Sequence, residues 1–530
     1  MPRSHDLVAR RIVVKRADSS SRRGGEELVS SRAPATPGPY RTEGGGKLRP
    51  YTLGFRAATR AGRSVAALLL AMGLSAAAPG PVPAAPGEGA TLSSTEGYGL
   101  VRDLMSDERS RRRRAAGRLI EAGDETLVPA LVDALFFIPR KDRELALNVL
   151  ESLTGERLGS RYLDWVELVG SRTELRPKEG YAGWKGSLLE RIDHRYGRLV
   201  DSDAPARIRL EEVVWGGVRL EGIPALDRPR HVGARDADFM LDDEIVFGVS
   251  GGGEHRAYPR RVLSWHEMAN DVVGGEPLTL SFCTLCDSAV VYSGRLASGQ
   301  VLTFGTSGLL YRSNKLMVDR STGTLWSNLT GEAVLGPLAG EDPPPTLEVL
   351  PVTVTTWAAW RQRHPETTVM AVDRTRAERW GFDYSPGAAD RARRGVSFPV
   401  WRKSDRLEPK AEVFALRLGG VPKAYPVEAV LAEGVVNDAV GGEPVVLVAE
   451  PESGAIRAYR RGGHRFRRGP EGAEGSVLDR DGRRWRLSEE SLEPPPGAEG
   501  SESLRRVPGH QSFWFGWYGF YPSTELYAPE

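Results

Sequence analysis

An internal repeat in the second half of the chain constrains the fold more than any other feature. Matching residues lie at one constant separation of 167 positions: Tyr258 with Tyr425, Asn270 with Asn437, and Pro277 with Pro444. After a small deletion, Trp357 and Trp360 recur as Trp514 and Trp517, at a separation of 157. A constant separation predicts two copies of one domain. We place a first copy at residues 205–375, a linker at 376–407 and a second, degenerate copy at 408–530.

Each copy is predicted to be mainly β. Segments rich in β-branched or alternating apolar residues flank glycine-rich turns, which is typical of hairpins. In the first copy these segments are 244–249, 254–258, 278–282, 289–292, 301–304, 316–318 and 324–326. Two short helices are predicted there, over 263–273 and 355–364. We therefore expect small twisted sheets or partial barrels, with the two copies packed against each other.

A short helical module is predicted before the repeat, at residues 98–170. Apolar residues recur at three- and four-residue steps over 107–121, 126–137 and 141–153. The stretch Val128–Leu135 resembles the second helix of a HEAT-type repeat. So small a stack cannot bury a core alone, so we expect it to pack on the first copy of the repeat. The predicted fold class is α+β: an all-α HEAT-like module followed by a β-rich duplicated domain.

The first hundred residues are interpreted as a targeting region. Residues 1–63 are basic and rich in Arg, Ser, Gly and Pro, which predicts disorder. Residues 64–78 join the apolar run Val65–Leu74 to small residues, the order of a signal-peptide h-region and cleavage site. Residues 79–97 are expected to be a linker. These features predict export to the periplasm or beyond, with translation starting near Leu53.

The apolar run of this targeting region is too short to span a bilayer, which needs about 20 apolar residues. We therefore expect no transmembrane helix.

Composition excludes other classes of protein. The chain has 72 Lys and Arg against 70 Asp and Glu, a formal charge of +2, which gives no general affinity for nucleic acid. The basic run Arg111–Arg114 follows Asp107 and Glu108, so it is interpreted as a solvated helix face. With only 2 cysteines, Cys283 and Cys286, no disulfide framework holds the fold together.

Comparison of the two copies separates residues of the fold from candidates for chemistry. Glycines, prolines, Asn-Asp pairs and tryptophans are shared, which indicates a structural role; Asp271 belongs to this set. Only the first copy has Trp265-His266-Glu267, and only it has the cysteines, whose counterparts in the second copy are Glu450 and Ser453. The stretch Phe304–Asn314 also has no counterpart. Any chemistry is therefore predicted in the first copy.

The leading hypothesis is a thiol-based redox site. Two thiols at i and i+3 can close a disulfide if their Cα atoms lie within about 7 Å. In this interpretation Cys283 and Cys286 are the reactive pair, His266 is the base or proton shuttle and Glu267 orients it. Asp287 is expected to raise the pKa of Cys286. Four further residues are expected to line the pocket: Trp265, Tyr311, Ser313 and Asn314. No cofactor is required, and the partner would be a thiol, a disulfide or a small molecule.

Two alternatives stay open. Cys283, Cys286 and His266 are also three ligands suited to zinc or copper, with an open fourth position that His255 could fill. The other alternative is a non-catalytic binding protein, in which the HEAT-like module and the Trp-rich second copy dock a protein partner. Two glycine-rich segments, Gly251–Gly253 and Gly305–Gly308, are predicted to be a turn and a loop.

Several of these motifs together resemble the bacterial domain-of-unknown-function family 3179 (DUF3179). The matching stretches are Trp265–Glu267, Asn270-Asp271, Phe282–Cys286, Phe304–Asn314, Met317–Arg320 and Leu325–Ser327. The resemblance is strong over residues 210–375 and weak over 408–530. The family has no established activity. Some of its members look like selenoproteins with selenocysteine at this motif, which by resemblance favours redox chemistry and points to Cys286 as a reactive position.

Overall fold

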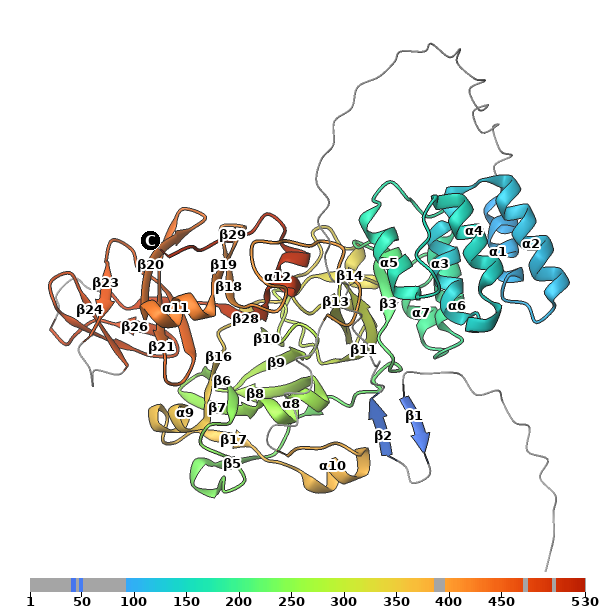
Figure 1. Ribbon diagram of the computed structural model, residues 1–530. Coiled ribbons are helices and arrows are strands. Elements are labelled where there is room, and N and C mark those ends of the chain that lie inside the picture. The colour runs from blue at the N-terminus through green and yellow to red at the C-terminus, as the bar shows by residue number, and fades with distance from the viewer. Residues whose placement is uncertain are drawn as a thin grey trace, which may run out of the picture. The chain divides into compact units, whose positions relative to one another are not determined.

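The computed structural model describes residues 40–43, 47–50, 92–385, 396–469, 475–497 and 502–529 (Figure 1). The predicted signal segment at 64–78 lies outside the described residues. Before residue 92 the structure describes one antiparallel hairpin, β1 (Tyr40–Glu43) with β2 (Lys47–Pro50), in a stretch predicted to be disordered. This hairpin belongs to a compact unit separate from the rest of the chain. Among the described residues, no helix is both long and apolar enough to cross a membrane.

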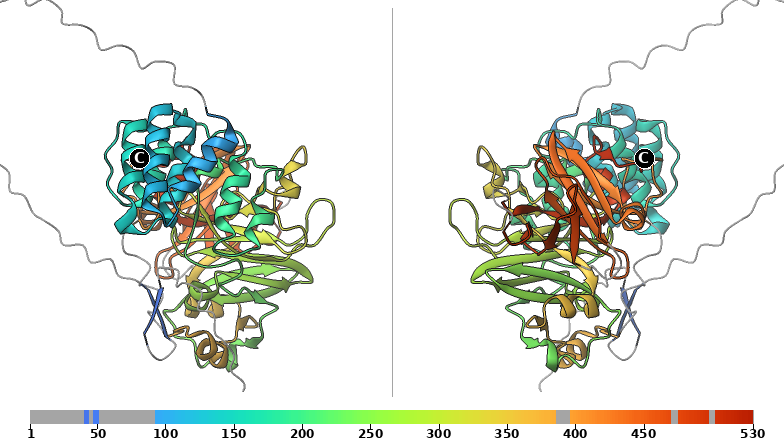
Figure 2. Two further views of the ribbon diagram at one scale, coloured as in Figure 1. Left: turned by 90° about the vertical axis from the view of Figure 1, so that its right-hand side faces the viewer. Right: turned by 90° about the vertical axis from the view of Figure 1, so that its left-hand side faces the viewer.

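Seven α-helices form the N-terminal module (Figures 1 and 2). They are α1 (Ser94–Asp103), α2 (Arg109–Ala122), α3 (Val128–Phe137), α4 (Glu144–Thr154), α5 (Tyr162–Ser171), α6 (Tyr181–Leu189) and α7 (Tyr196–Leu199). The three predicted helices correspond to α2, α3 and α4. The HEAT-like stretch Val128–Leu135 is buried along its whole length.

The core of this module continues into the strands of the first copy. Side chains of the helices share one apolar cluster with Leu309, Leu316 and Leu325 of that copy. The expectation that the helices pack on the next domain is therefore confirmed.

Three five-stranded sheets form the first copy. One has the order β15-β10-β9-β8-β4, the second β14-β13-β12-β11-β3 and the third β16-β6-β7-β17-β5. The strands are β3 (Val213–Trp215), β4 (Leu226–Asp227), β5 (His231–Gly233), β6 (Ile245–Gly251), β7 (Glu254–Pro259), β8 (Met268–Val273), β9 (Glu276–Cys283), β10 (Ser288–Ser293), β11 (Phe304–Tyr311), β12 (Asn314–Asp319), β13 (Leu325–Ser327), β14 (Ala333–Leu335), β15 (Val349–Leu350), β16 (Thr353–Thr356) and β17 (Thr368–Met370). The helices are α8 (Arg260–His266), α9 (Trp357–Arg363) and α10 (Arg374–Trp380).

A four-stranded sheet of order β28-β18-β19-β29 and a curled eight-stranded sheet of order β20-β21-β22-β27-β26-β25-β24-β23 form the second copy. Its strands are β18 (Glu412–Leu418), β19 (Val421–Pro426), β20 (Val435–Val440), β21 (Glu443–Glu450), β22 (Ala455–Arg460), β23 (Phe466–Arg468), β24 (Ser476–Asp479), β25 (Arg484–Leu487), β26 (Ser491–Glu493), β27 (Leu504–Val507), β28 (Gly509–Phe513) and β29 (Glu525–Leu526). The helices are α11 (Val427–Glu433) and α12 (Trp514–Phe520). The molecule is thus α+β, as predicted.

The two copies have the same series of elements. The run β6-β7-α8-β8-β9-β10 and the run β18-β19-α11-β20-β21-β22 follow one order, and their hairpins pair alike. Shared residues make the same bonds: the amide of Asn270 bonds the backbone of Phe304, and that of Asn437 bonds Phe466. These side chains hold the strands in place, which is the structural role that sharing predicted.

Three predicted elements are wrong, and one of them is the strand over 301–304, of which only Phe304 lies in a strand, β11. Residues 263–273 do not form one helix: α8 ends at His266, and Met268–Val273 is strand β8. The reason is Glu267, whose φ of 58° is left-handed and ends the helix. Gly274-Gly275 then forms the turn to β9. The predicted loop Gly305–Gly308 lies inside strand β11, at a bulge.

Candidate functional site

The two cysteines lie in the tight connection between β9 and β10. Cys283 is the last residue of β9 and pairs with Ser288, the first residue of β10, so Cys286 lies in the loop between them. Asp287 adopts a left-handed φ of 52°, and its carboxylate lies 2.5 Å from the Arg260 guanidinium. This ion pair fixes the loop to α8. Both cysteines are free thiols and are buried.

Cys286 is held by polar side chains from neighbouring strands. Its Sγ lies 3.1 Å from the Ser288 hydroxyl and accepts a hydrogen bond of 2.8 Å from Nδ2 of Asn314. The Asn328 amide donates to the same Ser288 hydroxyl at 3.3 Å. Asn314, predicted to line the pocket, is therefore in direct contact with a sulfur.

A tight turn places Asn314 at this sulfur. Tyr311 pairs with Asn314 across a two-residue turn, in which Arg312 and Ser313 have φ values of 50° and 57°. Positive φ at both central residues is the requirement of a type I′ hairpin turn and costs free energy in residues other than glycine. The predicted pocket residues Tyr311 and Ser313 thus belong to the turn. Tyr311 packs on Phe520, and the Ser313 hydroxyl is buried with no hydrogen-bond partner among the described residues.

Lys315 is a charged residue of this site that was not predicted. Its Nζ donates to the carbonyls of Glu267 at 2.6 Å and Phe282 at 3.0 Å, and lies 3.7 Å from a carboxylate oxygen of Glu267. The side chain is 6% exposed. The signal that could have identified it is a lysine directly after Asn314, inside a strand of apolar residues. Glu267 is therefore close to the thiols, but it faces Lys315 rather than orienting a histidine.

The two thiols differ in acidity. Burial and the charge of Glu267 raise the pKa of Cys283, but hydrogen bonds from Cys286, followed by the charge of Lys315, outweigh them, so the pKa lies below its usual value. Burial raises the pKa of Cys286 well above its usual value, and the neighbouring Cys283 raises it further. The direction predicted for Cys286 is right but its cause is not, because burial and Cys283 raise this pKa and the Asp287 carboxylate is paired with Arg260.

His266 is directed toward other groups. Its Nδ1 lies 2.7 Å from the Pro224 carbonyl, and its Nε2 forms a hydrogen bond with the Tyr384 hydroxyl. Tyr384 belongs to the predicted linker, part of which packs on the first copy: Phe382 stacks on the predicted pocket residue Trp265, whose Nε1 donates to the Asp383 carbonyl. His266 and Trp265 therefore form a second cluster, with no hydrogen bond to either sulfur within the described part of the chain.

The predicted metal ligands do not converge among the described residues. That part of the chain has no group of three His, Cys, Asp or Glu side chains arranged to hold a metal ion. Both ring nitrogens of His266 contact groups other than the thiols. The candidate fourth ligand, His255, bonds Ser250 at 2.6 Å and stacks on His364.

The second copy covers the thiol pair. The backbone N–H of Phe513 donates to the Cys286 carbonyl at 2.8 Å. A Cβ on Gly516 of α12 would lie 2.6 Å from the Cys286 Cβ, so only glycine fits there without a shift. Phe513, Phe515 and Val400 complete one buried cluster with Cys283 and Cys286. The thiols are therefore closed from solvent by residues that come after the first copy in the chain.

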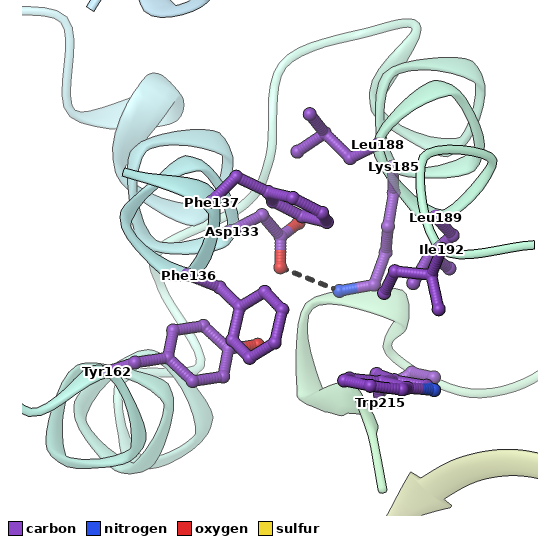
Figure 3. A pocket seen from close by; sticks show the side chains of 10 residues that line it. Asp133, Phe136, Phe137, Tyr162, Lys185, Leu188, Leu189, Ile192 and Trp215 are labelled. Atoms are coloured by element: carbon purple, nitrogen blue, oxygen red, sulfur yellow. Dashed lines mark hydrogen bonds and ion pairs between the residues drawn. The ribbon is translucent and has the colours of Figure 1, made fainter. Parts of the chain in front are cut away.

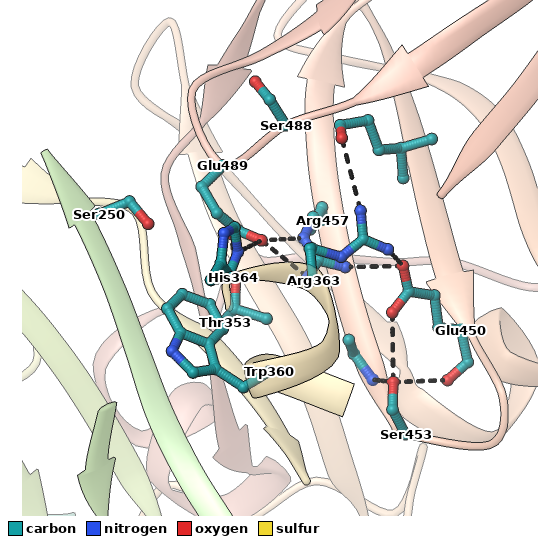
Figure 4. A network of polar contacts seen from close by, with 12 residues as sticks. Ser250, Thr353, Trp360, Arg363, His364, Glu450, Ser453, Arg457, Ser488 and Glu489 are labelled. Atoms are coloured by element: carbon teal, nitrogen blue, oxygen red, sulfur yellow. Dashed lines mark hydrogen bonds and ion pairs between the residues drawn. The ribbon is translucent and has the colours of Figure 1, made fainter. Parts of the chain in front are cut away.

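In the corresponding loop of the second copy, ion pairs between charged side chains take the place of the thiols (Figure 4). Glu450 pairs with Arg363 of α9 and lies 3.2 Å from Arg457. Arg457 in turn lies 2.8 Å from the buried carboxylate of Glu489. Arg363 comes from α9 of the first copy, so each copy places a helix on the other's loop. We call this set of charged residues the ionic junction.

A buried ion pair lies inside the helical module (Figure 3). Lys185 of α6 lies 2.9 Å from Asp133 of α3, which also accepts a hydrogen bond from the Tyr181 hydroxyl. The adjoining cavity has a volume of only about 20 Å³. Burial raises the pKa of Asp133, and the charge of Lys185 opposes that rise. This pair joins two helices and leaves no space for a ligand.

The fold and the site define an α+β protein with a buried pair of neighbouring thiols. A family model described as a protein of unknown function (DUF3179) matches residues 220–524, which is more than half of the chain. The chain therefore belongs to this family, as the motifs around the cysteines indicated. Neither the curated proteins nor the solved structures contain a match.

Proposed function

We propose that Cys283 and Cys286 form a reversible dithiol–disulfide centre in an exported protein. The observation that carries the proposal is the unequal pair: hydrogen bonds from Cys286 and the charge of Lys315 favour the thiolate of Cys283, while Cys286 stays a thiol. The thiolate is the nucleophile in thiol–disulfide exchange. The acidity order therefore favours Cys283 as the attacking group and Cys286 as the resolving group.

The proposed reaction reduces a disulfide of the partner. The Cys283 thiolate attacks one partner sulfur, the partner's S–S bond breaks, and the departing thiolate takes a proton. Cys286 then loses its proton and attacks the Cys283 sulfur. The mixed disulfide breaks, the second partner thiol leaves, and the Cys283–Cys286 bond remains. Two electrons and two protons pass to the partner, and the reverse sequence oxidises a dithiol.

Lys315 and Glu267 supply charge and proton transfer in this scheme. Burial lowers the pKa of Lys315 and raises that of Glu267, so their charged forms depend on each other and on the thiolates. Asn314 donates to the Cys286 sulfur and would stabilise its thiolate in the second step. His266 is left out of this scheme because its ring nitrogens contact Pro224 and Tyr384.

Export and duplication are part of the proposal. The basic flank, apolar run and small residues before residue 79 have the order of a signal peptide, and an oxidising compartment suits a disulfide-forming pair. The common series of elements in the two halves supports descent from one duplicated domain. In that interpretation only the first copy kept or acquired the thiols.

The test is thiol counting on the purified full chain, alongside metal analysis. After reduction, unfolding and maleimide labelling, mass spectrometry should find both cysteines modified. After equilibration with oxidised glutathione, neither should react, and the monomer should have lost two hydrogen atoms. Cys283→Ser and Cys286→Ser should each stop that loss. Thiols that stay reduced in oxidised glutathione would overturn the proposal, and stoichiometric zinc or copper would favour the metal-binding alternative.

A further inference from the structure

A cavity lies close to the thiol pair and is separate from the polar groups that surround the sulfurs. Its volume is about 320 Å³, at the lower end of the range of about 300–1,000 Å³ for small-molecule sites. Helix α5 lines one part, residues 396–404 a second, and α12 a third. No sequence pattern indicates this cavity, because the three segments are far apart in the chain.

One part of the cavity wall is aromatic and apolar. The residues concerned are Phe398, Pro399, Val400, Trp514, Phe515 and Tyr518. Two of these, Val400 and Phe515, also belong to the buried cluster of Cys283 and Cys286. Aromatic rings and prolines present flat, rigid surfaces, which favour a flat apolar body over a flexible polar one.

Among the charged side chains that the structure describes in this wall, one cation forms no ion pair. Arg161 lies 3.3 Å from Asp164, and Lys403 pairs with Glu167. Arg402 has no ion-pair partner among the residues that the structure describes. Its Nη1 donates to the Gly519 carbonyl at 3.3 Å, but a guanidinium carries five N–H donors in a planar fork. Donors therefore remain for a ligand.

We propose that this cavity binds a small organic anion: a flat apolar body that carries one carboxylate. The rings of Phe398, Trp514 and Phe515 would hold the body, and Arg402 would bind the carboxylate. Arginine suits a carboxylate because two parallel N–H groups match its two oxygens. The proposal concerns binding alone and does not depend on the redox activity of the thiols.

The experiment is isothermal titration calorimetry of the full-length protein with 2-naphthoate. The uncharged analogue 2-naphthalenemethanol has the same ring system, so it isolates the contribution of the charge. We expect naphthoate to bind and the alcohol to bind at least about tenfold more weakly, from the strength of hydrogen bonds to charged groups. Arg402→Met should weaken the binding of naphthoate by about the same factor and leave the affinity for the alcohol unchanged.

Two further variants separate binding from folding. Arg402→Lys keeps the charge and should restore part of the affinity for naphthoate. Lys403→Met removes a cation of the same wall that Glu167 already neutralises, and should change the affinity by less than about twofold. Circular dichroism should give one unfolding temperature for all folded variants. Equal binding of acid and alcohol, no binding of naphthoate, or equal affinity in Arg402→Met would each overturn the proposal.

Discussion

Lys315 is the buried cation among the groups that lower the pKa of Cys283. Its ammonium group is buried, where an opposite charge acts more strongly than at the surface. There it lowers the pKa of Cys283 and opposes the charge of Glu267, which raises that pKa. Two backbone carbonyls hold it in place, those of Glu267 and Phe282. A cation fixed by carbonyls keeps its position whether the thiols are charged or neutral.

Removal of this cation should make Cys283 less acidic. In Cys286→Ser, Cys283 is the one thiol of the protein, so thiolate absorbance against pH follows it alone. Adding Lys315→Met should raise the midpoint by about one pH unit or more, the usual effect of a close opposite charge. Lys423→Met is the control, because it removes a lysine of the second copy whose Nζ lies 2.7 Å from the carboxylate of Asp438. An unchanged midpoint would contradict the role of Lys315.

Asn314 should control the second step of exchange. Asn314→Leu removes the hydrogen bond to the Cys286 sulfur, so the pKa of Cys286 should rise further. The attack of Cys286 on the mixed disulfide at Cys283 should then slow. In oxidised glutathione, mass spectrometry should then detect the mixed disulfide at Cys283 accumulating. Asn328→Leu is the matched control, since Asn328 bonds Ser288 and not the sulfur. Equal accumulation in both variants would show that packing, not the bond to sulfur, is responsible.

Among the elements, α12 decides whether the thiols are accessible. The helix closes the site through Gly516, where a side chain has no room. Three residues later, a Cβ added at Gly519 would lie 3.5 Å from a side-chain carbon of Val400, which is an ordinary contact distance. Both glycines are buried in the same helix. They therefore form a natural pair for comparing a tight contact with a relaxed one.

Gly516→Ala should destabilise the protein by about 1–3 kcal/mol, the usual cost of overpacking. Because the strain falls on α12, alkylation of the thiols by iodoacetamide should also become faster. Gly519→Ala should be neutral or slightly stabilising, since alanine favours a helix more than glycine does. Thermal unfolding and the alkylation rate measure the two effects. Identical behaviour of the two variants would contradict the assignment of α12 as the cover.

At the element scale the sequence predicted the hairpins β6-β7, β9-β10 and β12-β13, because hairpins are local, but it missed β8 and β14 to β17. The prediction of a helix over 263–273 was wrong because Glu267 adopts a left-handed backbone conformation, which is uncommon for residues other than glycine. At the site, Asn314 was found through its motif, but Lys315 was not, since a lysine in a strand usually faces solvent. The cover by Gly516 and the cavity beside it arise from contacts over more than 200 residues of chain, which no local pattern records.

On the scale of the whole molecule, the ionic junction joins the two copies. Glu489 is its centre: Arg457 lies 2.8 Å away, Arg506 also pairs with it, and it accepts a hydrogen bond of 2.6 Å from Thr353 of the first copy. Burial raises the pKa of Glu489, but the two guanidinium groups outweigh it, so the pKa lies well below its usual value. A buried carboxylate between two cations is costly to disturb, because removal of one partner leaves the others uncompensated.

Glu489→Gln should therefore destabilise the protein by about 3–5 kcal/mol at neutral pH. A carboxylate with a depressed folded pKa stabilises the fold above its unfolded pKa, about 4.3, and this stability is lost as the pH falls toward the folded pKa. The difference in unfolding temperature between wild type and variant should thus be constant from pH 7 to about 5 and shrink below about 4.3. Glu493→Gln, at a partly exposed pair with Arg486, should show little effect at any pH. A difference that stays constant into acid would mean that the charge of Glu489 is not what joins the copies.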